Sequence, residues 1–285
     1  MSIIMKGSEV ASAMKEELLG EVEKLGQKGI VPELAIVRVG ARPDDLAYER
    51  GAVKKMGGMG IHCRVVELPE SISQADFEKE FSAINGNPDV HGILLFRPLP
   101  KQLNEDAVRS MINPKKDIDC MSPVNMAKVF AGDESGFAPC TPEAVMEVLA
   151  HFGIDLKGKR VTVVGRSMVV GKPLSMLLLK KNATLTICHT RTVDLGATCR
   201  NAEILIAAAG KAKMITADFV SENSVVVDVG INVDSDGKLC GDVDFEAVAP
   251  KVASITPVPG GVGTVTSSVL AKHVVRAANY LTGLS

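Results

Sequence analysis

The chain has no tryptophan and only two tyrosines among its 285 residues. No apolar run is long enough to cross a bilayer, and the first ten residues lack the basic, apolar and small-residue zones of a signal peptide. A net charge of −2 gives no electrostatic reason to expect nucleic acid or a membrane surface as a partner. We therefore expect a cytoplasmic protein that binds neither.

The six cysteines do not form a recognisable metal or redox motif. None belongs to a Cys-x-x-Cys pair, and none lies near a histidine at the spacing that zinc sites use. Several stand in apolar runs such as "LTICHT". We expect buried, reduced thiols and no metal site.

Apolar, β-branched runs alternate with helical patterns along most of the chain, which is typical of an α/β fold with a parallel sheet. The predicted strands are 33–39, 62–68, 90–96, 160–165, 183–188, 203–209 and 224–230. The predicted helices include 75–85, 141–153 and 266–281. For the helix at 141–153, we expect Thr141 to be the N-cap residue and the proline after it to hold the first helical position.

The length suits one large domain or two ordinary ones. The loop "GDESGFAPCTP" separates two groups of predicted elements and places a boundary near 135–145. The last predicted helix follows a stiff loop, "TPVPGGVGT", at 256–264. That helix is expected to return to the first domain.

The stretch 160–192 predicts a phosphate-binding loop. A buried strand ends at Gly165, a short loop reaches Gly171, and a helix is expected from about Pro173. This order of elements brings a helix N-terminus and bare backbone N–H groups against a pyrophosphate. The glycine spacing alone is a weak signal, and the flanking strand and helix strengthen it.

The residues at the end of the following strand favour NADP over NAD. NAD enzymes usually carry an acidic residue there, which binds the adenosine ribose. This chain offers Thr190 and Arg191 instead, and Arg166 extends from the first loop. Two cations and a hydroxyl suit a 2′-phosphate. Arginines that simply face solvent are the alternative interpretation, and NAD stays possible.

Five separated motifs occur in a characteristic order: "PCTP", "VVGRSMVVGKP", "DVGIN", "GDVDF" and "TPVPGGVG". With them the chain resembles the bifunctional 5,10-methylenetetrahydrofolate dehydrogenase/5,10-methenyltetrahydrofolate cyclohydrolase family, nearly from end to end. The resemblance implies a folate-binding catalytic domain at 1–140, joined by the C-terminal helix at 265–285. It also implies a Rossmann-type NAD(P) domain at 141–264, a folate cleft between the domains, and a homodimer.

Site residues follow from the matching motifs. Together with the loop analysis above, the resemblance implies a cofactor site formed by Thr141, Gly165, Arg166, Ser167, Gly171, Thr190, Arg191, Ile231 and Thr266. It implies a folate site formed by Tyr48, Asp119, Pro259, Gly260, Gly261 and Gly263. In that family the tyrosine stacks on the folate rings and the aspartate hydrogen-bonds the pterin, so Tyr48 and Asp119 are the predicted catalytic residues.

The first half departs from the family pattern at several positions. The family's lysine, four residues after the tyrosine, is Ala52 here, and the glutamine that partners it is Phe96, which Arg97 follows. Asp45 replaces a serine, and Cys120 replaces the glycine after the pterin-binding aspartate. Arg97 could pair with a folate glutamate or face solvent.

These replacements affect the two family reactions differently. Hydride transfer to nicotinamide requires positioning of the two carbons, and no side chain need carry a proton. Hydrolysis of the methenyl cation requires an activated water and a group with a tuned pKa. We therefore expect dehydrogenase activity with weak or absent cyclohydrolase activity. The alternatives are a full bifunctional enzyme, with Lys55 or Asp45 substituting, and a folate- or nucleotide-binding protein without turnover.

Overall fold

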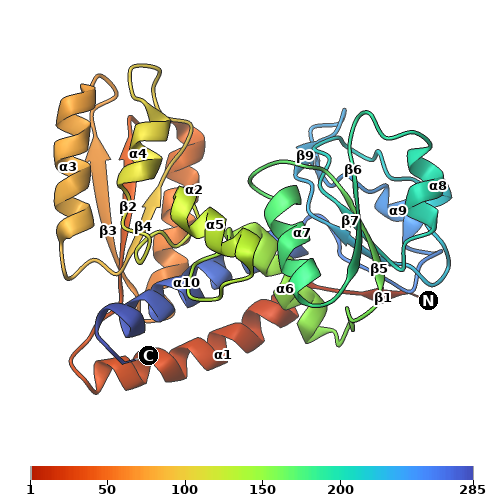
Figure 1. The fold of residues 1–285 in the computed structure, drawn as a ribbon, viewed down its shortest axis with the longest axis horizontal. Helices are drawn as coiled ribbons and strands as arrows, with labels where there is room; N and C mark the ends of the chain where they lie inside the picture. The colour runs from red at the N-terminus through yellow and green to blue at the C-terminus, as the bar shows by residue number, and fades with distance from the viewer. Residues whose placement is uncertain (1, 285) are drawn as a thin grey trace. The chain divides into compact units, whose positions relative to one another are not determined.

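The computed structural model describes residues 2–284, which form two compact units. Unit 1 contains the described residues up to Ala13 together with Pro139–Thr266, and unit 2 contains Met14–Ala138 and the chain from Ser267 onward (Figure 1). Within the described range, no helix combines the length and the apolar character needed to cross a membrane.

Unit 2 is built on a three-stranded parallel sheet in the order β3-β2-β4. The strands are β2 (Glu33–Val39), β3 (His62–Leu68) and β4 (Gly92–Leu95). Every residue of β2 is buried because this strand lies in the middle of the sheet, between two neighbours. The predicted strands 33–39 and 62–68 are confirmed, and the third predicted strand is shorter than expected.

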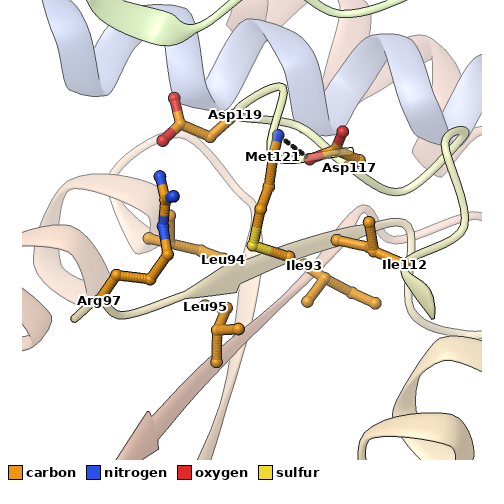
Figure 2. A pocket seen from close by; sticks show the side chains of 8 residues that line it. All are labelled: Ile93, Leu94, Leu95, Arg97, Ile112, Asp117, Asp119 and Met121. Carbon is orange, nitrogen blue, oxygen red and sulfur yellow. Dashed lines mark hydrogen bonds between the residues drawn. The ribbon is translucent and has the colours of Figure 1, made fainter. Parts of the chain in front are cut away.

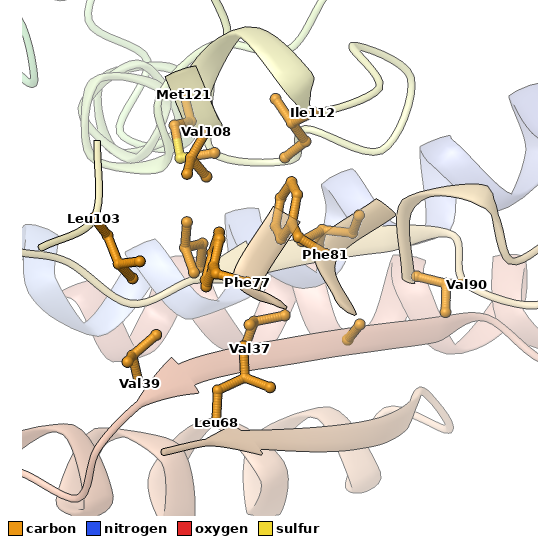
Figure 3. Packing of buried hydrophobic residues seen from close by; sticks show 13 residues of the cluster. Val37, Val39, Leu68, Phe77, Phe81, Val90, Leu103, Val108, Ile112 and Met121 are labelled. Atoms are coloured by element: carbon orange, nitrogen blue, oxygen red, sulfur yellow. The ribbon is translucent and has the colours of Figure 1, made fainter. Parts of the chain in front are cut away.

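The core of unit 2 lies between this sheet and helices α3 (Gln74–Gly86) and α4 (Glu105–Met111) (Figure 3). Phe77 and Phe81 stand one turn apart on α3, and their rings stack at 5.6 Å between centroids. Both are fully buried against Val37 and its neighbours in the cluster. Burial of two aromatic rings is a large hydrophobic contribution, which keeps the strand ends in fixed positions.

Four more helices belong wholly or partly to unit 2: α1 (Gly7–Gly26), α2 (Pro43–Gly57), α5 (Pro123–Ala131) and α10 (Val262–Leu281). The sheet touches α10 closely, since a Cβ at Gly92 of β4 would meet Val274 at 3.1 Å. His273 also lies 2.7 Å, from Nδ1, to the carbonyl oxygen of Ile118. The C-terminal helix therefore packs on the sheet of unit 2.

Unit 1 is built on a six-stranded parallel sheet in the order β1-β11-β8-β7-β5-β6. Its strands are β1 (Ile3–Ile4), β5 (Arg160–Val164), β6 (Thr184–Cys188), β7 (Ile204–Ala207), β8 (Val225–Asp228) and β11 (Ser254–Ile255). A small hairpin pairs β9 (Asn232–Val233) with β10 (Leu239–Cys240). The other helical segments are α6 (Cys140–His151), α7 (Gly171–Lys180), α8 (Leu195–Arg200), α9 (Phe245–Val248) and the 3₁₀ turn η1 (Ala217–Phe219).

Because these strands are parallel, the carboxyl ends of β5, β6, β7 and β8 meet at one edge of the sheet. Open α/β sheets bind their ligands in the crevice outside that edge. The parallel arrangement confirms the predicted Rossmann-type α/β class.

Some predicted boundaries are wrong. The strand β1 pairs in parallel with β11 of the six-stranded sheet, so the described residues up to Ala13 group with unit 1 and not with Met14–Ala138. The N-cap of α6 is Pro139 and not Thr141. The helix can begin before Pro142 because a proline is tolerated within the first turn of a helix. For the same reason α7 begins at Gly171, before Pro173. The last helix begins at Val262, four residues earlier than predicted.

Candidate functional site

Two glycines shape the loop between β5 and α7. Gly165 has φ of 141°, and a Cβ there would lie 2.1 Å from the carbonyl oxygen of Ala208. A Cβ on Gly171 would lie 2.2 Å from the carbonyl oxygen of Gly165. Neither position can accept a side chain without moving backbone, so glycine is required for this tight strand-to-helix turn. The turn leaves the start of α7 at the ligand-binding edge of the sheet.

The two predicted cofactor ligands in this loop, Arg166 and Ser167, differ in whether they make hydrogen bonds within it. Arg166 is exposed at the carboxyl end of β5. Ser167 is also exposed, and its Oγ accepts hydrogen bonds from the backbone N–H groups of Val170, at 3.1 Å, and Gly171, at 3.4 Å. Ser167 therefore acts as a cap for the start of α7, in the manner of an N-terminal serine.

The second strand of the site ends in a turn organised by a histidine. The His189 backbone N–H donates to Oγ1 of Thr192 at 2.9 Å, and its Nδ1 accepts from the backbone N–H of Arg191 at 3.1 Å. Thr190 and Arg191 are both exposed. These bonds hold the two candidate phosphate ligands at the end of β6.

A third part of the candidate cofactor site surrounds the glycine-rich loop after β11. Gly260 has φ of 101°, and its carbonyl oxygen accepts from the backbone N–H of Gly7 at 2.8 Å. A Cβ on Gly261 would lie 2.4 Å from the carbonyl oxygen of Pro257. A Cβ on Gly263 would touch Ile231 at 3.9 Å. The left-handed backbone explains the glycine at 260 and close backbone packing explains the one at 261, whereas the contact at Gly263 is an ordinary one.

The remaining predicted residues of unit 1 lie around these loops. Ile231 is 69% exposed, so its side chain is available to a ligand. Thr266 donates from Oγ1 to the carbonyl oxygen of Gly263 at 2.9 Å. Thr141 is half-buried in the first turn of α6, and Pro259 is exposed and follows a cis peptide bond.

In unit 2, Tyr48 lies over Phe96. The ring centroids are 5.5 Å apart and the ring planes meet at 67°, an edge-to-face pair. Tyr48 on α2 is 51% exposed, whereas Phe96 beyond β4 is only 8% exposed and Ala52, one turn further along α2, is 5% exposed. The two positions at which the resemblance expects a lysine and a glutamine are therefore buried and apolar.

The predicted pterin ligand, Asp119, stands in a loop that another aspartate organises. Asp117 is buried and accepts from the backbone N–H groups of Met121, at 2.7 Å, and Ser122, at 2.8 Å. Between them, Cys120 is buried with φ of 56°, a left-handed conformation that favours glycine. This backbone geometry gives a physical reason for the glycine that the family carries here.

A pocket lies against this loop and the end of β4 (Figure 2). It is lined by Ile93, Leu94, Leu95, Arg97, Ile112, Asp117, Asp119 and Met121. Figure 2 shows the guanidinium of Arg97 pointing toward the carboxylate of Asp119. Arg97 also forms an ion pair with Glu105 at 3.3 Å. The pocket therefore combines an apolar floor with one cation and two carboxylates.

Lys55 does not extend into solvent, as most surface lysines do. It is half-buried, and its Nζ donates to Oγ of Ser267 on α10 at 2.5 Å. Burial lowers the pKa of Lys55. Sequence reasoning considered Lys55 as a substitute for the family lysine and did not identify Ser267 as its partner.

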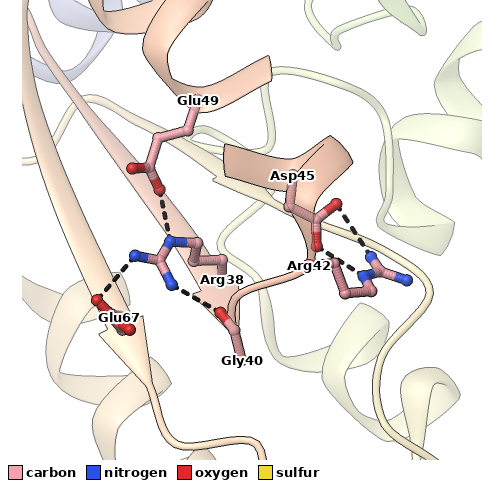
Figure 4. A network of polar contacts seen from close by, with 6 residues as sticks. All are labelled: Arg38, Gly40, Arg42, Asp45, Glu49 and Glu67. Carbon is pink, nitrogen blue, oxygen red and sulfur yellow. Dashed lines mark hydrogen bonds and ion pairs between the residues drawn. The ribbon is translucent and has the colours of Figure 1, made fainter. Parts of the chain in front are cut away.

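Charged networks hold the first turns of α2 (Figure 4). Both carboxylate oxygens of Asp45 accept from Arg42, at 2.7 and 3.1 Å, and Arg42 is the N-cap residue of α2. Arg38 of β2 is 5% exposed and bonds Glu49 and Glu67, each at 2.7 Å. Glu49 is the neighbour of Tyr48, so Arg38 ties the tyrosine-bearing turn to the sheet.

Sequence reasoning missed two acidic residues at the carboxyl edge of unit 1. Asp228 and Asp242 are buried and accept hydrogen bonds from several backbone N–H groups. Both occur inside motifs quoted above, "DVGIN" and "GDVDF". An aspartate within two residues of a glycine in each of two motifs was the available signal.

Comparison with protein families gives two matches that together cover most of the chain. Residues 5–119 match the family described as tetrahydrofolate dehydrogenase/cyclohydrolase, catalytic domain. Residues 139–282 match tetrahydrofolate dehydrogenase/cyclohydrolase, NAD(P)-binding domain.

Individual proteins show the same likeness. The chain is 57% identical over 274 residues to the bifunctional protein FolD of Clostridioides difficile, covering 96% of each chain. It is 56% identical to the protein of the same name from Carboxydothermus hydrogenoformans, covering 98% of each chain.

Two crystal structures superpose closely on this chain. The bifunctional FolD enzyme of Campylobacter jejuni has a TM-score of 0.95 at 39% identity, covering 98% of this chain and 99% of the other. The Trypanosoma brucei enzyme, complexed with NADP and an inhibitor, has a TM-score of 0.90 at 35% identity, covering 98% of each.

Proposed function

The chain belongs to the tetrahydrofolate dehydrogenase/cyclohydrolase family, and from this premise we propose that it oxidises 5,10-methylenetetrahydrofolate with NADP while hydrolysing the methenyl product weakly or not at all. The observation that carries the second part is the burial of Ala52 and of Phe96, the latter against the ring of Tyr48. A methyl group and a phenyl ring replace the two polar groups that proton transfer at this position would use.

The dehydrogenase reaction requires two things of this chain. The folate must be held with its one-carbon unit facing the nicotinamide, and water must be kept from the hydride path. We assign the folate rings to the exposed face of Tyr48 and the pterin to Asp119. The loop Gly260, Gly261 and Gly263 would let backbone approach both partners. NADP supplies the hydride acceptor when bound.

The preference for NADP is proposed from the exposed Arg166 and Arg191. Each guanidinium offers several N–H donors to a 2′-phosphate, and Thr190 adds a hydroxyl. Thr141, Ser167, Ile231 and Thr266 complete the proposed cofactor contacts, with Gly165 and Gly171 giving the phosphate access to backbone. A homodimer and a cytoplasmic location also stay predictions.

A second candidate function is the full bifunctional activity, and two observations favour it. The relatives at 55–57% identity are named bifunctional. Burial also lowers the pKa of Lys55, which is the direction that a proton-transfer role at neutral pH requires. Asp45 is a poorer substitute for the family lysine, because Arg42 donates hydrogen bonds to both of its carboxylate oxygens.

A paired assay on one purified sample tests the proposal. The first measurement follows reduced nicotinamide as methylenetetrahydrofolate is oxidised with NADP, and the second follows loss of methenyltetrahydrofolate against a buffer blank. We expect rapid oxidation and hydrolysis no faster than the blank. Enzymatic hydrolysis well above the blank would contradict the proposal and establish the second candidate. The double variant Ala52→Lys with Phe96→Gln is the matched comparison, and it is expected to gain hydrolysis.

A further inference from the structure

Two carboxylates are enclosed at the carboxyl edge of unit 1. Asp228 is the last residue of β8, and Asp242 follows β10; they are 3% and 0% exposed. Burying a carboxylate is costly unless hydrogen bonds compensate it, so each must be held by donors. Backbone N–H groups from three separate loops provide them.

Asp242 organises the loop after β7. Its Oδ2 accepts from the backbone N–H groups of Ala209, at 2.6 Å, and Gly210, at 3.0 Å. Its Oδ1 accepts from the backbone N–H of Lys211 at 2.8 Å and from Nδ2 of Asn232 at 2.9 Å. Three consecutive N–H groups therefore converge on one carboxylate, which fixes the conformation of the loop.

Asp228 holds Asp242 in turn. Its Oδ1 accepts from the backbone N–H groups of Gly230, at 2.9 Å, and Asp242, at 3.0 Å. Its Oδ2 accepts from the backbone N–H of Val243 at 2.8 Å. The end of β8, the loop after β7 and the segment after β10 thus form one hydrogen-bonded assembly.

The adjacent glycines are required by these carboxylates. A Cβ on Gly230 would lie 2.3 Å from Oδ1 of Asp242. A Cβ on Gly241 would lie 1.9 Å from Oδ2 of Asp228. Contacts of that length do not occur between a Cβ and an oxygen, so a glycine at each position makes room for the carboxylate. This explains why an aspartate and a glycine recur together in both motifs.

The assembly occupies one half of the ligand-binding edge. The phosphate loop and Arg191 lie at the ends of β5 and β6, and the sheet order places β7 and β8 on the other side of β5 from β6. A dinucleotide that binds across such an edge has its adenosine at one half and its nicotinamide at the other. We propose that Asp228 and Asp242 are positioning residues for the nicotinamide half, because they hold the loops after β7 and β8 that would receive it.

The test is Asp242→Asn, which removes the charge and keeps the shape. Michaelis constants are measured for NADP, NAD and methylenetetrahydrofolate, and hydrogen exchange is followed at the amides of residues 209–211. We expect faster exchange there and a rise of about tenfold in the constants for NADP and NAD alike, as loss of charge-assisted hydrogen bonds implies. The constant for the folate should change less than twofold. Equal factors are expected because both cofactors carry the same nicotinamide.

Asp234→Asn is the matched control. Asp234 lies in the same unit and also accepts backbone N–H bonds, from Asp236 and Lys238, in the exposed turn between β9 and β10. Its other partner is Nζ of Lys213 at 3.1 Å, a side-chain contact outside the three amides that Asp242 holds. All three constants should stay unchanged in this variant. If Asp242→Asn does not fold, Asn232→Ala removes a single donor to the same carboxylate, and a smaller parallel rise for both cofactors is expected.

Three results would overturn the proposal. The first is a folded Asp242→Asn protein with faster exchange but unchanged Michaelis constants for both cofactors, and the second is a rise in the Michaelis constant for NADP alone. The third applies when Asp242→Asn does not fold, and it is an Asn232→Ala protein with unchanged Michaelis constants. The inference rests on the cofactor site and on the oxidation half of the proposed function. Methenyl hydrolysis by the wild-type enzyme would contradict the proposed loss of the second activity, yet leave this comparison of constants intact.

Discussion

The amine of Lys55 on α2 donates a hydrogen bond to the hydroxyl of Ser267 on α10, at 2.5 Å. The interaction joins two helices of unit 2 that are more than two hundred residues apart in sequence. The role of Lys55 distinguishes the two candidate functions, since this residue is close to one turn beyond Ala52 and burial lowers its pKa.

Replacing Lys55 by methionine keeps the apolar stem and removes the amine. If Lys55 serves to join the helices, dehydrogenase activity should fall less than about threefold and methenyl hydrolysis should stay at the blank. The measurement is the paired assay, with Ser267→Ala as the control that removes only the acceptor. Hydrolysis that is present in the wild type and lost in Lys55→Met would assign the proton chemistry to this lysine.

Phe96 is expected to be important for both stability and the position of Tyr48. Phe96→Gln places an amide in a site that is 8% exposed, and burial of an unpaired polar group with loss of an aromatic contact should cost about 3 kcal/mol. Phe96→Leu keeps an apolar side chain and should cost less. Urea unfolding compares the three proteins. Equal stability of Phe96→Gln and the wild type would show that the position is not buried in solution.

The two arginines proposed for the 2′-phosphate give a prediction about cofactor choice. Arg166→Ala and Arg191→Ala should each raise the Michaelis constant for NADP by about tenfold or more, since a charge-assisted hydrogen bond contributes about 1.5–3 kcal/mol. The constant for NAD should change less than twofold, because NAD has no 2′-phosphate. Steady-state kinetics with both cofactors measures this. Parallel changes for NADP and NAD would argue that the arginines act through the loop and not on the phosphate.

Much of the fold was predictable because its signals are local. Strands 33–39 and 62–68 each contain a short β-branched pair, Ile36–Val37 and Val65–Val66, and the structure confirms both predicted ranges. Helix starts were predicted less well. Pro142 and Pro173 can each occupy more than one place in a first turn, so the proline pattern does not fix which residue begins the helix.

The candidate site was predictable only where a motif carries it. The glycines at 165 and 171 predict a tight turn, and in the structure an added Cβ at either position would clash with backbone atoms. By contrast, the bonds from Lys55 to Ser267 and from Asp242 to Ala209 join residues far apart in sequence, and no periodicity encodes such pairs. They follow from the tertiary arrangement alone.

The charged networks at α2 provide a matched pair of stability predictions (Figure 4). Arg38→Met removes a nearly buried guanidinium and leaves Glu49, also largely buried, without its partner, so the free energy of unfolding should fall by about 3 kcal/mol. Arg42→Ala breaks a pair whose arginine side chain is 45% exposed, and should cost less than about 0.5 kcal/mol. Chemical denaturation of both variants measures the difference. Equal losses would mean that burial does not set the strength of these pairs.

The buried Asp228 predicts a pH dependence of stability. Burial raises the pKa of Asp228 to about 6, and this effect exceeds the opposing one of its backbone N–H donors. The folded protein therefore binds this proton more tightly than the unfolded chain, in which the pKa is close to an ordinary 3.8. The resulting stabilisation is fully present below the pKa of the unfolded chain and is lost as pH rises through about 6.

Asp228→Asn removes the titrating group, so the difference in unfolding free energy between wild type and variant should shift in favour of the wild type as pH falls from 7 to 5. Urea unfolding at both pH values measures that difference. A difference that does not change with pH would show that Asp228 is ionised throughout this range, with its backbone donors outweighing burial.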